Sequence, residues 1–194
     1  MTGLTSDWLL DVTPHVEHTV PGTIVLDGTK LFEATFSFEY TPRWVYDDGG
    51  RSKYFKGRAG DCVVRAITIA TGLDYKEVYD ALNIARANPG RVSEKTRRML
   101  LANTSSRQGH SKRTYDRFIK EELGWTWVPT KIPGQPGAVH LLREELPSGR
   151  LICRCSKHLV AVIDGVIHDT HDSSVSRTHG QGKRMVYGYY IDER

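Results

Sequence analysis

The strongest constraint on this chain is an apolar stretch that follows a glycine, an aspartate and a cysteine. Residues 60–70 read GDCVVRAITIA, and Thr71-Gly72 comes next. The apolar side chains leave almost no polar face, so the stretch predicts a helix buried in the core. Asp61 suits the N-cap of this helix, because its carboxylate can accept hydrogen bonds from the free N–H groups of the first turn.

Cys62 would then occupy the first position of the helix. Unpaired N–H groups and the positive end of the helix dipole favour thiolate over thiol there. A cysteine in this place is a suitable nucleophile. The alternative is a small, inert core residue, because free cysteines are commonly buried. This stretch alone does not decide between the two interpretations.

Length and composition predict one globular domain with a short appendage. The 194 residues are 39% hydrophobic and 26% charged, which is enough for a substantial core. No apolar run approaches the ~20 residues that span a membrane, and the first residues lack the pattern of a signal peptide. We therefore expect a cytoplasmic protein without membrane contact. Three cysteines, two of them alternating at Cys153 and Cys155, argue against a disulfide scaffold.

Positive charge is concentrated in one segment. Residues 86–120 contain ten Lys or Arg side chains and two acidic ones, whereas the net charge of the whole chain is +4. Such a segment can attract nucleic acid or an acidic protein partner. The alternative is an ordinary solvated helical face.

Residues 1–55 predict an N-terminal β extension packed on the main body. Expected strands cover residues 23–27, 31–40 and 44–46. Asp27-Gly28 is a hairpin dipeptide, and Pro21-Gly22 predicts a further turn.

Residues 56–194 predict helices followed by an antiparallel sheet, which is an α+β arrangement. Expected helices cover residues 62–71, 75–86, 93–101, 115–123 and 139–146. Expected strands cover residues 125–128, 151–155, 159–163, 166–169 and 185–191, with a turn at 134–137 and a loop at 173–182. Asp74 and Thr114 are the expected caps of the second and fourth helices.

The hairpin around Asp164-Gly165 supplies a base for the cysteine. A two-residue turn places His158 and Asp169 on one face as diagonal neighbours, and places Asp172 on the opposite face. A histidine with a carboxylate behind it and a thiol in front is the arrangement of a catalytic triad. The carboxylate fixes the tautomer, and the imidazole deprotonates the thiol.

Three segments together resemble the papain-like cysteine peptidase superfamily, and most of all its C39-like branch. They are the GDC of residues 60–62, the LICRC of residues 151–155 and the KHLVAVIDGVIHD of residues 157–169. The resemblance covers residues 56–191 and implies a papain-like fold, with N-terminal helices packed on a C-terminal antiparallel sheet. It also implies Cys62 as the nucleophile, His158 as the base and Asp169 as the orienting residue.

One position departs from the family pattern. The family usually places a glutamine about six residues before the cysteine, where its side chain donates to the oxyanion. Lys56 stands there in this chain. The positive charge of Lys56 could replace the glutamine amide, or the backbone N–H of Cys62 could be the sole donor to the oxyanion. A third alternative is that activity has been lost. Asp61 and Asp172 remain alternative oxyanion or third-member residues, and a thiol transferase remains an alternative activity.

Two other functions use the same residues. Cys153, Cys155 and His158, with His168, His171 and Cys62 nearby, could bind zinc, although structural zinc sites usually use C-x2-C spacings. We favour buried strand residues for Cys153 and Cys155. The basic segment, together with Trp125 and Trp127, could instead form a nucleic-acid-binding module, although only one tryptophan could stack on a base.

We therefore expect a cysteine-dependent peptidase or amide or isopeptide hydrolase that acts on a protein or peptide. No metal or organic cofactor is expected. The alternative function is an inactive papain-like module that binds nucleic acid or an acidic protein partner through residues 86–120. The sequence leaves the oligomeric state open.

Overall fold

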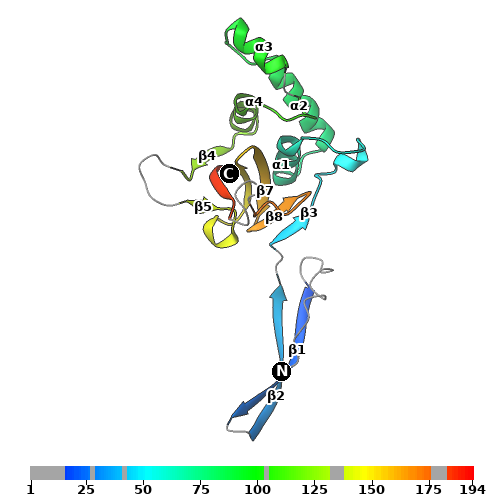
Figure 1. The fold of residues 1–194 in the computed structure, drawn as a ribbon, viewed down its shortest axis with the longest axis vertical. Coiled ribbons are helices and arrows are strands. Elements are labelled where there is room, and N and C mark those ends of the chain that lie inside the picture. The colour runs from blue at the N-terminus through cyan, green and yellow to red at the C-terminus, as the bar shows by residue number, and fades with distance from the viewer. Residues whose placement is uncertain (1–15, 27–28, 41–42, 103–104, 132–137, 176–182) are drawn as a thin grey trace. The chain divides into compact units, whose positions relative to one another are not determined.

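The computed structural model describes residues 16–26, 29–40, 43–102, 105–131, 138–175 and 183–194, with side chains from residue 43 onward. It divides the chain into two compact units, Met1–Pro42 and Arg43–Arg194 (Figure 1).

The first unit contains two long antiparallel strands, β1 (Val16–Leu26) and β2 (Thr29–Tyr40). The turn expected at Asp27-Gly28 lies outside the described residues. The turn expected at Pro21-Gly22 is wrong, because β1 continues through it and Pro21 pairs with Thr35. The long pairing with β2 overrides the local turn preference of the dipeptide.

The boundary between the units differs from the one expected after residue 55. Strand β3 (Trp44–Tyr46) pairs in parallel with β8 (Val166–Asp169) and so belongs to the sheet of the second unit. Pairing between strands so far apart in the chain leaves no local sequence signal, which explains the difference.

The sheet of the second unit has the strand order β3-β8-β7-β6-β9-β4, with β5 paired to β9. Every pairing except that of β3 with β8 is antiparallel. The remaining strands are β4 (Thr126–Pro129), β5 (Val139–His140), β6 (Arg150–Cys155), β7 (His158–Ile163) and β9 (Met185–Ile191). The chain is therefore of mixed α+β class, as expected.

Four α-helices occur in the part of the chain that the structure describes. They are α1 (Cys62–Thr71), α2 (Tyr75–Ala87), α3 (Glu94–Ala102) and α4 (Lys112–Arg117), which continues as a π-helical turn over Phe118–Glu122. None of the described helices combines the length and the apolar character needed to cross a membrane.

Two details of the helices differ from expectation. Ser111 caps α4 by accepting from the backbone N–H of Thr114, so the helix begins before the expected Thr114 cap. The helix expected over residues 139–146 is wrong. Residues Val139–His140 form β5 on the edge of β9, and a 3-10 turn follows at Arg143–Glu145. An available strand edge has overridden a short helical pattern.

Helix α1 packs against β6, β7 and β8 (Figure 1). Side chains along β7 alternate between two apolar clusters. Leu159 and Ala161 pack with α1 and α2, whereas Val160 and Val162 pack with Cys153 and other residues on the other side. Every residue from Val63 to Ala70 is buried. This packing places the start of α1 beside the start of β7.

Asp61 does not cap α1, so this expectation is wrong. Its fully buried carboxylate makes no capping hydrogen bond and instead pairs with Arg51, whose Nε lies 2.8 Å away, and with Arg65. It also accepts a 2.6 Å hydrogen bond from the Tyr75 hydroxyl. Two arginines compete better than the backbone for a buried carboxylate, because hydrogen bonds between charged groups are stronger.

This network makes Asp61 important for stability. We expect Asp61→Ala to lower the free energy of unfolding by about 3–5 kcal/mol, because it leaves buried cations without their partner. Urea unfolding measures the loss. Asp74→Ala is the matched control. Asp74 caps α2 by accepting from the backbone N–H groups of Lys76 and Glu77, and its removal should cost about 1 kcal/mol. Equal losses in the two variants would contradict the importance of the network.

Candidate active site

The β7–β8 hairpin sets the position of the base. Asp164 and Gly165 both adopt left-handed conformations, with φ of 49° and 80°, as a type I′ turn requires. The turn pairs Ile163 with Val166 and Val162 with Ile167, which is the predicted register.

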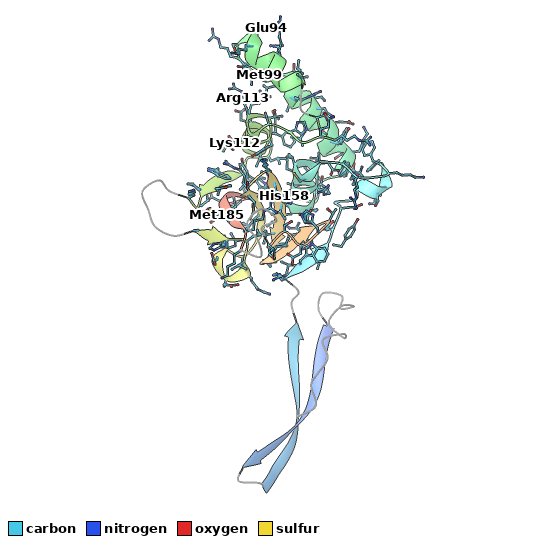
Figure 2. All side chains as sticks on the ribbon, viewed as in Figure 1. Glu94, Met99, Lys112, Arg113, His158 and Met185 are labelled. Carbon is cyan, nitrogen blue, oxygen red and sulfur yellow. The ribbon has the colours of Figure 1, made fainter. Side chains whose placement is uncertain are left out.

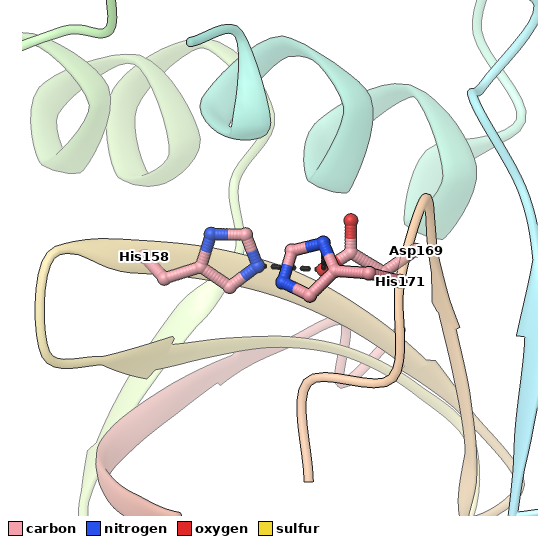
Figure 3. Close-up of side chains that lie close together, drawn as sticks. All are labelled: His158, Asp169 and His171. Carbon is pink, nitrogen blue, oxygen red and sulfur yellow. Dashed lines mark hydrogen bonds and ion pairs between the residues drawn. The ribbon is translucent and has the colours of Figure 1, made fainter. Parts of the chain in front are cut away.

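His158 and Asp169 form the central hydrogen bond of the site. The Nε2 atom of His158 lies 2.6 Å from Oδ2 of Asp169 (Figure 3). His158 is the first residue of β7, and Asp169 is the last residue of β8. Both side chains are largely buried, with 10% and 4% of their surface exposed. The bond therefore lies where few water molecules compete with it.

Cys62 completes a continuous chain of three polar groups. Cys62 and His158 line the same cleft, and the two side chains lie close enough for each to shift the pKa of the other. Because Nε2 of His158 is bonded to Asp169, Nδ1 is the ring nitrogen left for the thiol. The structure thus brings Cys62, His158 and Asp169 together, as the sequence predicts.

The electrostatics favour a charged pair. Burial raises the pKa of Cys62, but its hydrogen bond to His158 and the charges of His158 and Arg65 outweigh burial and leave this pKa below the ordinary value. Burial lowers the pKa of His158, but the hydrogen bonds to Asp169 and Cys62 raise it to about 9. Burial likewise opposes the charge of Asp169, but His158 and Ser173 hold its pKa far below the usual range. The lowered pKa of Cys62 beside the raised pKa of His158 favours a thiolate–imidazolium pair.

Two residues of the site were missed by the sequence analysis. Arg65 is buried on α1, where its guanidinium pairs with Asp61 and lies 3.6 Å from Oδ1 of Asp169. A charged residue within an otherwise apolar helix was the signal that could have revealed it. Ser173 is fully buried and donates its hydroxyl to Oδ2 of Asp169. Nothing in the sequence pointed to this serine, because it follows the end of β8.

The three alternative residues lie elsewhere. Asp172 pairs with Arg43 at 2.5 Å and accepts from the backbone N–H and hydroxyl of Ser174. Lys56 is exposed and is not among the described residues that line the cleft over Cys62. The carboxylate of Asp61 is paired with Arg51 and Arg65.

Cys153 and Cys155 are buried strand residues. Burial raises the pKa of Cys153 well above its ordinary value and that of Cys155 to about 11, so both remain thiols. Within the described parts of the chain, the single group whose side chains lie close enough to share a metal ion is His158, Asp169 and His171. It contains no cysteine, and Nε2 of His158 is already bonded to Asp169. The alternative Cys153-x-Cys155-x-x-His158 zinc site is therefore not formed among the described residues.

A cleft of about 1240 Å³ opens over Cys62 and His158. Of the ten basic side chains in residues 86–120, Lys112 is the one that lines it. Trp125 is buried in the core, and the half-buried Trp127 packs against Tyr190 with 4.7 Å between ring centroids. Neither tryptophan is an open platform for a base.

Comparison with protein-family models, with curated proteins and with solved structures found no match to this chain. The functional argument therefore rests on the geometry of the site.

The charged pair predicts selective alkylation. We expect iodoacetamide to label Cys62 at pH 7 and to leave Cys153 and Cys155 intact, with a midpoint for Cys62 below the ~8.5 of a free thiol. Mass spectrometry measures the extent of alkylation of each cysteine across pH 5–10. In His158→Ala the opposing hydrogen bond is lost, burial prevails, and the midpoint should move above ~8.5. Labelling of Cys153 or Cys155 with an unreactive Cys62 would contradict an activated thiolate.

Proposed function

We propose that this chain is a cysteine-dependent hydrolase of peptide, isopeptide or amide bonds. The observation that carries the proposal is the continuous Cys62–His158–Asp169 chain at a wide cleft. A lowered thiol pKa beside a raised imidazole pKa in a cleft is the combination expected of a nucleophile and its acid–base partner.

The reaction follows from the charges. The Cys62 thiolate attacks the carbonyl carbon, and the C=O electron pair moves onto oxygen. His158 then gives its proton to the leaving nitrogen as the C–N bond breaks, which leaves a thioester on Cys62. Neutral His158 next takes a proton from water while the resulting hydroxide attacks the thioester. The acid product leaves, and the thiolate–imidazolium pair returns.

The missing cap of α1 supports a site for the oxyanion. Because Asp61 makes no capping hydrogen bond, no side chain of Asp61 occupies the N–H groups of the first turn. Cys62 is the first residue of α1, so its own N–H and the positive end of the helix dipole are directed toward a developing negative charge. This donor removes the need for a glutamine at position 56.

We further propose that the fold is papain-like and closest to the C39-like branch. Three features support this: the nucleophile begins a helix packed on the sheet, the base begins β7, and the orienting aspartate ends β8. The proposed domain covers residues 43–194, because β3 belongs to its sheet.

A library of fluorogenic peptide amides tests the activity. We expect Cys62→Ala to abolish hydrolysis and Asp169→Asn to lower kcat by about 10²–10⁴-fold, because His158 loses its orientation and its charged partner. Hydrolysis should also fall above about pH 9, where His158 loses the proton that it gives to the leaving group. Cys153→Ala is the control and should retain activity within about twofold.

Two outcomes would contradict the proposed hydrolase, and the second would favour the alternative function. Unchanged hydrolysis in Cys62→Ala would show that a contaminating enzyme is responsible. No hydrolysis at all, together with steeply salt-dependent binding of an oligonucleotide, would favour the module built on residues 86–120.

A further inference from the structure

The cleft over Cys62 is strongly cationic. Its described lining residues include six arginines or lysines and a single acidic residue, Asp48. The six are Arg51, Arg58, Arg65, Lys112, Arg154 and Lys157. Asp48 offsets little of this positive charge, because its two carboxylate oxygens accept hydrogen bonds from the backbone N–H groups of Gly50 and Ser52.

Part of this charge is already neutralised inside the protein. Arg51 and Arg65 pair with the buried Asp61, and Arg65 also lies near Asp169. The imidazolium of His158 faces the Cys62 thiolate and the Asp169 carboxylate. These groups form the catalytic and structural network, so they leave little net charge for a ligand.

Three exposed cations of the cleft remain without an ion-pair partner among the described residues: Arg58, Lys112 and Lys157. They come from three different elements, which are the loop before α1, the start of α4 and the turn between β6 and β7. All three side chains are exposed. Their convergence on one cleft from separate parts of the chain distinguishes them from a run of like charges on one helix face.

Lys157 adds a backbone argument. It directly precedes His158 and has a φ of 52°, in the left-handed region that glycine or asparagine adopts more easily. The tight turn between Cys155 and His158 therefore fixes the backbone of Lys157 directly beside His158.

Aromatic rings hold a fourth cation in place. The Arg154 guanidinium lies 5.5 Å from the Trp127 ring centroid and 5.6 Å from that of Tyr187. Tyr187, Tyr115 and Tyr46 also line the cleft. Rings interleaved with cations offer both apolar contact and charge to an extended chain.

We propose that the substrate is an acidic polypeptide, with aspartate or glutamate side chains flanking the bond that Cys62 attacks. This rests on the proposed hydrolase function. The carboxylates would pair with Arg58, Lys112 and Lys157. The cleft of about 1240 Å³ exceeds the range of about 300–1,000 Å³ usual for small-molecule pockets, which favours a polymer. A nucleic acid has no acyl carbon for the thiolate to attack. An acidic polypeptide therefore explains both the cationic lining and the position of Cys62.

The first test uses the charge of the alkylating reagent. We define the selectivity ratio as the rate of Cys62 alkylation by iodoacetate divided by that by iodoacetamide. Lys157→Glu should lower this ratio about three- to fivefold, because two units of charge change near the thiolate. Lys157→Gln changes one unit of charge, so it should lower the logarithm of the selectivity ratio by about half as much. The effect should largely disappear in 0.5 M NaCl.

The matched control is the residue next to Lys112. Arg113 is exposed on α4 but does not appear among the described residues lining the cleft (Figure 2). Lys112→Glu should therefore lower the selectivity ratio, and Arg113→Glu should leave it within about 1.5-fold. Equal effects of the two changes, or no effect of Lys157→Glu, would overturn the proposal.

The second test identifies the ligand class. A ten-residue peptide rich in glutamate should protect Cys62 from iodoacetamide at least fivefold better than the same peptide with glutamine at those positions. A ten-nucleotide oligo-dT should protect less than the glutamate peptide. Better protection by oligo-dT would overturn the proposal in favour of a nucleic acid. The outcomes also separate the two proposals. If Cys62 is not alkylated selectively at neutral pH, the proposed hydrolase function is wrong. If Cys62 is alkylated normally but the glutamate peptide gives no extra protection, the inferred substrate class alone fails.

Discussion

The guanidinium of Arg65 connects the start of α1 to the end of β8. It pairs with Asp61, one residue before Cys62, and lies 3.6 Å from the Asp169 carboxylate that is hydrogen-bonded to His158. Asp61 in turn bonds Arg51 and Tyr75, so the loop before α1 and the helix after it share the same buried charge. Buried ions require partners, because an unpaired charge in the interior is costly. The need to pair these charges therefore fixes the relative positions of the elements that carry the site.

The same burial gives the site its chemistry. Desolvation opposes the charge of each member of the triad, yet Cys62 and Asp169 both have lowered pKa values and His158 a raised one. Hydrogen bonds and opposite charges within the site outweigh that cost, because few water molecules compete. Cys153 shows the contrast. It is more deeply buried and lacks a cationic neighbour, and its pKa is raised. Burial alone raises the pKa of a thiol, whereas His158 beside Cys62 lowers it.

Local patterns predicted much of this arrangement. The Asp164-Gly165 turn and the alternation of β7 correctly placed His158 beside Asp169, and the apolar run after Cys62 correctly predicted α1. The errors occurred where distant residues competed with a local preference. Asp61 was expected to cap α1, but its arginines held the carboxylate. Residues 139–146 had a helical pattern, but the edge of β9 took the first of them into a strand.

The sequence by itself determined the elements of the site, because hairpin register and helix formation depend on residues close in the chain. It also singled out Cys62, since this is the one of the three cysteines that begins a buried helix. Only the tertiary structure decided that Arg65 and Ser173 support Asp169, and that Arg58, Lys112 and Lys157 line one cleft. These groups belong to separate elements. Their contacts arise from the packing of α1 and α4 beside the sheet and of β3 along β8, which no local spacing encodes.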